Sequence, residues 1–156
     1  MGQTRLSGPF CTGDLQQGET NGPNIGFVEL VQTFDIAVDG TLTQSVTRYI
    51  PAGSIITSLA VDVLTAYDSA TSATLSVGVT AGATTYTSGV NVKAATGRIA
   101  QTYTAAQLAK MSGQSVLGVA DPTVPAVVAT VTSVGQPTVG YVHVTMHYVQ
   151  LTSSQG

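Results

Sequence analysis

Short runs of alternating apolar and polar residues, separated by turn-forming residues, restrict the fold of this chain more than any other feature. Between residues 27 and 152, runs rich in Val, Ile, Thr and Tyr recur about every 8 to 12 residues, with Gly, Pro or Asp between them. In the last run one face carries only large apolar groups, Val142, Val144, Met146 and Tyr148. Because successive side chains of a strand point to opposite sides, this period of two predicts half-buried β-strands.

The whole pattern predicts eight or nine strands. They cover residues 27–38, 41–50, 54–64, 74–80, 84–92, 99–104, 116–120, 127–134 and 139–152. Asp39-Gly40 predicts a hairpin between the first two strands, and Ala81-Gly82-Ala83 predicts another between the fourth and the fifth. Short strands at this spacing are typical of an antiparallel β-sandwich or a jelly-roll-like domain, so we expect an all-β fold.

Residues 104–111 form the one segment with a good helical pattern. Thr104 is a suitable N-cap and Gly113 follows the end, so we expect at most one short helix.

The first 26 residues carry Gly-Pro pairs and few large apolar groups, which predicts an extended N-terminal arm. We therefore divide the chain of 156 residues into an arm (1–26), one β-sandwich domain (27–152) and a flexible tail (153–156).

Charged residues are unusually few, at 8% of the chain, and the net charge is −3. A monomer with so little charge has weak electrostatic repulsion from its neighbours, so we expect much of its surface to be covered by other subunits. The five Lys and Arg residues are scattered and form no basic stripe, which argues against nucleic-acid binding.

No apolar run suits a signal peptide or a membrane span, so we expect neither export by that route nor a membrane partner. The lone Cys11 suits a reducing compartment.

The candidate chemical motifs fail on their spacing. His143 and His147 have the i, i+4 spacing of a helical metal pair, but on a strand such residues lie about 13 Å apart. The segment around Ser115 resembles a GxSxG nucleophile turn, yet Leu117 stands where the second Gly is needed. The eight Asp and Glu residues do not cluster along the sequence. We therefore expect no metal, no cofactor, no catalytic residues and no enzyme.

Five segments resemble small β-rich virion proteins of tailed bacteriophages: IPAGSII (50–56), VDV (61–63), TAYD (65–68), LSVG (75–78) and YTSGVNV (86–92). The resemblance extends over about residues 26–152. It implies a capsid decoration, or cement, protein, which is made in the host cytoplasm and sits on the outer surface of the phage head, often as a homotrimer. The implied partners are the major capsid protein and other copies of the chain.

Two groups of residues are predicted to bind these partners. The arm would contact the capsid or neighbouring subunits through Arg5, Leu6, Pro9 and Phe10. The second face of the last strand, which includes Tyr141, His143 and His147, would join copies into a trimer, because both faces of that strand are apolar enough to be largely covered.

Other functions stay open at this point. The chain could be a head-fibre or tail component of a virion. It could be a carbohydrate-binding β-sandwich that uses exposed tyrosines, although core or subunit contacts account better for the six Tyr residues. It could also be a small hydrolase, which would need a cleft with converging carboxylates.

Overall fold

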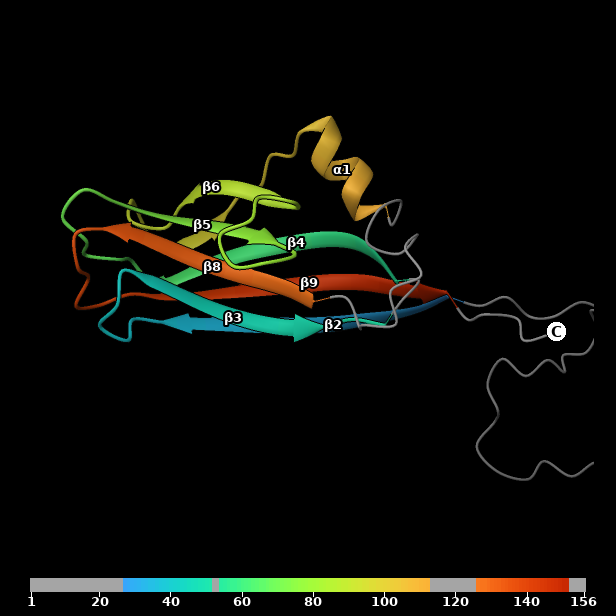
Figure 1. Cartoon of the computed structure of the whole chain (residues 1–156), viewed down its shortest axis with the longest axis horizontal. Helices are drawn as coiled ribbons and strands as arrows, with labels where there is room; N and C mark the ends of the chain where they lie inside the picture. The colour runs from blue at the N-terminus through green and yellow to red at the C-terminus, as the bar shows by residue number, and fades with distance from the viewer. Residues whose placement is uncertain (1–26, 52–53, 113–125, 152–156) are drawn as a thin grey trace, which may run out of the picture.

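The structure is a computed structural model that describes residues 27–51, 54–112 and 126–151. It is mostly β, with one short helix, as predicted (Figure 1). The elements are β2 (Phe27–Ala37), β3 (Thr43–Tyr49), β4 (Ser54–Thr65), β5 (Ser72–Gly78), β6 (Thr87–Asn91), β7 (Gly97–Ile99), α1 (Ala105–Met111), β8 (Ala126–Val134) and β9 (Tyr141–Leu151). The predicted arm, the strand at 116–120 and the tail lie outside the described residues.

The described strands form two antiparallel sheets of four, with the orders β2-β9-β4-β7 and β3-β8-β5-β6. Figure 1 shows the sheets as two layers, with α1 outside them. The pairing is nested: β2 pairs with β9, β3 with β8, β4 with β7 and β5 with β6. The chain therefore runs as one long antiparallel ribbon that is folded over into two sheets, which is the jelly-roll form of the β-sandwich.

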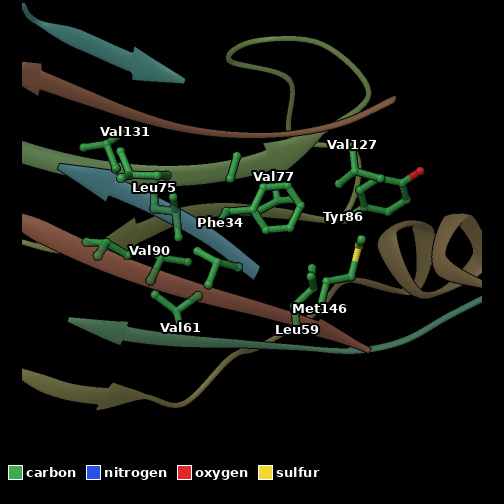
Figure 2. Packing of buried hydrophobic residues seen from close by; sticks show 14 of the residues in the cluster. Phe34, Leu59, Val61, Leu75, Val77, Tyr86, Val90, Val127, Val131 and Met146 are labelled. Carbon is green, nitrogen blue, oxygen red and sulfur yellow. The ribbon is translucent and has the colours of Figure 1, made fainter. Parts of the chain in front are cut away.

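The core lies between the two sheets (Figure 2). The first sheet contributes Phe34, Val61 and Met146, and the second contributes Leu75 and Val131, all fully buried. The predicted inner face of β9 is confirmed, because its four alternate residues are buried while the residues between them are half-buried on the outside. The period of two in the sequence thus follows directly from one covered and one open face of each sheet.

The hairpin predicted at Asp39-Gly40 is wrong. The two flanking strands lie in different sheets and do not pair with each other. The Asp39 carboxylate accepts hydrogen bonds from the backbone N–H of Thr41 (2.9 Å) and from its hydroxyl (2.6 Å), and Gly40 has a φ of +86°. This side-chain-supported turn carries the chain across the sandwich, so a turn signal alone did not reveal which sheet the next strand joins.

The second hairpin and the helix are confirmed. Strands β5 and β6 pair antiparallel across the turn that contains Gly82. The Thr104 hydroxyl accepts from the Gln107 N–H, and the Gln107 side chain accepts from the Thr104 N–H, which completes a capping box. The strand expected over 99–104 is wrong in its position: β7 covers Gly97–Ile99, residues 100–104 are not strand, and the Tyr103 hydroxyl donates to the Leu59 carbonyl (3.0 Å).

Asp68 holds the loop between β8 and β9. Its carboxylate accepts hydrogen bonds from the hydroxyl of Thr138 (2.5 Å), the backbone N–H of Thr138 (2.7 Å) and that of Val139 (3.1 Å). These bonds, with the Thr138 hydroxyl first, lower the pKa of Asp68 from its ordinary value of 3.8 to about 2.

We expect Asp68→Asn to lower the melting temperature at neutral pH and to have little effect in acid. A carboxyl group whose pKa is lower in the folded state stabilises the fold fully above its unfolded pKa, and this contribution disappears as pH falls through the folded pKa. The window here runs from about pH 4 down to about pH 2. The difference in melting temperature between wild type and variant should therefore be largest near neutral pH and should close across that window. Thermal unfolding followed by circular dichroism measures it, and a difference that does not change with pH would contradict this role.

Candidate interaction surfaces

The outer face of the β2-β9-β4-β7 sheet contains the predicted partner-binding residues of β9. Tyr141, His143 and His147 all lie there, half-buried, between the side chains of the neighbouring strands. The face is polar as well as apolar, because β2 and β4 contribute carboxylates to it. The expectation that both faces of β9 are largely covered therefore applies within one chain only to the inner face.

Each histidine on this face has its own carboxylate partner on β2. The Nδ1 of His143 lies 2.7 Å from Asp35, whose carboxylate also accepts a hydrogen bond from the Tyr141 hydroxyl (2.7 Å). The Nδ1 of His147 lies 3.3 Å from Glu29. The bond from His143, followed by that from Tyr141, lowers the pKa of Asp35.

A row of ionisable residues crosses all four strands of this sheet at one level. Asp35 on β2 is the register partner of His143 on β9, His143 is the partner of Asp62 on β4, and Asp62 is the partner of Arg98 on β7. The guanidinium of Arg98 binds both carboxylate oxygens of Asp62 at 2.8 Å and lowers the pKa of that carboxyl. We call Asp35, His143, Asp62 and Arg98 the charged row. Sequence reasoning missed it because only the strand register brings these residues together.

His143 and His147 lie on a strand, as the sequence predicts, and at different levels of the sheet. Each imidazole has a different carboxylate partner, and the residues are four positions apart on one strand. Among the residues that the structure describes, no group of three or more His, Cys, Asp or Glu side chains is arranged to hold a metal ion.

The outer face of the β3-β8-β5-β6 sheet has a different character. Most of its outward strand positions carry hydroxyl groups and none of those described carries a charge, the hydroxyl residues being Thr43, Ser45, Thr47, Ser72, Thr74, Ser76 and Thr132; Tyr49 and Val134 are exposed beside them. We call this set the hydroxyl face. Thr130, in the middle, is covered, because its hydroxyl accepts from the Gly82 N–H at 3.0 Å and bonds Ser45 at 3.0 Å. The β5–β6 turn thus lies over part of this face.

A small groove lies along the neighbouring edges of the two sheets. It has a volume of about 190 Å³, and no charged residue lines it. Its walls are Thr87–Asn91 and residues 99–102, and the Thr87 hydroxyl is bonded to the Gln101 side chain (3.2 Å). This volume is below the roughly 300 Å³ of most small-molecule sites, and the groove offers no carboxylate, imidazole or thiol to act on a substrate.

Comparison with known protein families, with curated proteins and with solved structures found no match for this chain. In the parts of the chain that the structure describes, no helix has the length and apolar character needed to cross a membrane. The predicted arm contacts, Arg5, Leu6, Pro9 and Phe10, lie outside the described residues.

Proposed function

We propose that this chain is a virion structural protein that binds the outer surface of a phage capsid and stabilises it as a decoration, or cement, protein. The observation that carries the proposal is the pair of outer sheet faces: the charged row on one and the hydroxyl face on the other each offer polar side chains from several strands to a partner. Jelly rolls serve in viral capsid proteins, although the same fold also occurs in lectins and cupins, so the fold supports the proposal by analogy.

A decoration protein stabilises the capsid by binding to it. If the subunit binds only the intact capsid, the stabilisation grows with the logarithm of the ratio of the free subunit concentration to the dissociation constant. Few charges favour this task, because contacts between the hydroxyl face and a capsid would bury no unpaired ion. The proposed partners are the major capsid protein and further copies of the chain, for which the sequence predicts a homotrimer.

Deletion of residues 2–22 is expected to abolish binding to capsids. These residues precede the sandwich, which begins at Phe27, and they include the four predicted contact residues of the arm. Co-sedimentation with purified capsids that lack the protein measures the binding, with the full-length chain as the positive control. The deletion variant should keep the melting temperature of the full-length chain, so that loss of binding is not loss of folding. Unchanged binding by a folded deletion variant would overturn the role of the arm.

A carbohydrate-binding module is the second candidate, and the groove between residues 87–91 and 99–102 favours it. Its lining is neutral and rich in hydroxyl and amide groups, which suits an uncharged sugar. Tyr49, which is 61% exposed, stands on β3 at the opposite edge of that sheet from β6, so it would not contact a sugar bound in the groove. Saturable binding on a glycan array, together with no binding to capsids, would favour this module over the decoration protein.

A further inference from the structure

The charged row alternates between acidic and basic side chains across the sheet. From β2 to β7 the order is carboxylate, imidazole, carboxylate and guanidinium. The two outer members are accessible, since the side chain of Asp35 is 47% exposed and that of Arg98 is 69% exposed. They stand on the two edge strands of the sheet, three strand spacings or about 14 Å apart, so they do not reach each other within one chain.

A row of four side chains that alternate between acidic and basic groups is complementary to the same row read in the opposite direction. If a second copy faces this sheet, related by a two-fold axis parallel to the strands, its row runs in the opposite direction at the same level. Asp35 of each copy then meets Arg98 of the other, and His143 of each copy meets Asp62 of the other. A two-fold axis along the row would instead place Asp35 against Asp35, and like charges held together in an interface are strongly unfavourable.

The rest of the face permits this approach. On one side of the row the next level carries only the short side chains of Thr33, Thr145 and Ala60. On the other side lie the larger side chains of Tyr141 and the exposed Leu64, which a second sheet would contact at the margin of the row. Val31, which is 52% exposed on the same face, adds an apolar contact. Three strands of eleven or twelve residues and the three residues of β7, at about 4.8 Å spacing, bound the face at roughly 600 Å², somewhat below the roughly 800 Å² per partner of a standard interface.

We infer that two copies of this chain associate through the outer face of the β2-β9-β4-β7 sheet as a two-fold pair, in which the charged rows of the two copies face each other in opposite directions. Such an isologous contact doubles every interaction. The inference is independent of the capsid role. The two-fold pair takes the place of the trimer that the sequence predicts through the same face of β9, and the oligomeric state of wild type distinguishes the two.

Reciprocal charge reversal tests this pairing. In Asp35→Arg the introduced guanidinium of each copy would lie against Arg98 of the other copy, and in Arg98→Glu the introduced carboxylate would lie against Asp35 of the other copy. Each variant alone should therefore dissociate about tenfold more readily or worse. Mixed in equal amounts, the two variants restore opposite charges at both ends of the row in a heterodimer. No pairing within one chain is restored by mixing, so recovery would come only from contact between copies.

Sedimentation velocity of the full-length chain at micromolar concentration is the measurement. The expected result is a dimer for wild type, monomers for each variant and a dimer for the mixture. Lys110→Glu, which makes the same charge change on α1 as Arg98→Glu makes on β7, should sediment as wild type. Monomeric or trimeric wild type, variants that dimerise as wild type does, or a mixture that stays monomeric would overturn the inference. Circular dichroism checks that both variants are folded.

Discussion

Replacing Phe34 by Ala should lower the free energy of unfolding by about 3–5 kcal/mol. The ring is fully buried at the middle of β2 and packs in the cluster between the two sheets (Figure 2). The guanidinium of Arg48, from β3 in the other sheet, lies 5.9 Å from the ring centroid, and its Nε donates to the Thr33 carbonyl (2.9 Å). Loss of the ring therefore leaves a cavity and removes a contact that joins the edge strands of the two sheets.

Urea unfolding followed by circular dichroism measures this change. Val31→Ala is the matched control, because Val31 lies on the same strand but points outward. It should change the free energy of unfolding by no more than about 0.5 kcal/mol. Equal losses in the two variants would contradict the assignment of the inner and outer faces of β2.

Gly140→Ala is expected to destabilise the fold by about 1–3 kcal/mol through overpacking. A Cβ at this position would lie 2.6 Å from two ring carbons of Tyr67. That ring is 1% exposed, and its hydroxyl lies 3.4 Å from the Ile36 carbonyl, so it has little room to move. Gly140 itself accepts a hydrogen bond from the Val38 N–H (3.1 Å), which holds the start of β9 beside the end of β2.

A double-mutant cycle isolates this clash. In a Tyr67→Ala background the obstructing ring is gone, so Gly140→Ala should cost much less than it does in wild type. The free energies of unfolding of the four proteins, from the same urea titration, give the coupling. Additive losses would show that the cost at Gly140 arises from something other than the Tyr67 ring.

Local patterns in the sequence predicted the elements of this fold well. The inward residues of β4 and β9, the β5–β6 hairpin and the capped helix at Thr104 all follow from period, turn residues and capping chemistry, which act over a few residues. The pairing of strands did not follow. Asp39-Gly40 marks a turn correctly, but the partners of β2 and β3 lie some hundred residues away in β9 and β8, and no short-range signal specifies them.

The surfaces depend even more on long-range register. Tyr141, His143 and His147 were assigned to one side of the last strand from the sequence, and the structure has them there. Their carboxylate partners, Asp35 and Glu29, come from β2, more than a hundred positions earlier in the chain. The charged row and the hydroxyl face each combine several strands, so their composition emerged only with the order of strands in each sheet.

The position of the protein on the virion tests the central proposal most directly. Cryo-electron microscopy of isolated virions that carry a labelled copy of the chain gives that position. The proposal predicts label on the outer surface of the head, at positions that repeat with the capsid lattice. It also predicts that heads without the chain are less resistant to heat. Label confined to the tail or to fibres, or virions without any label, would contradict it.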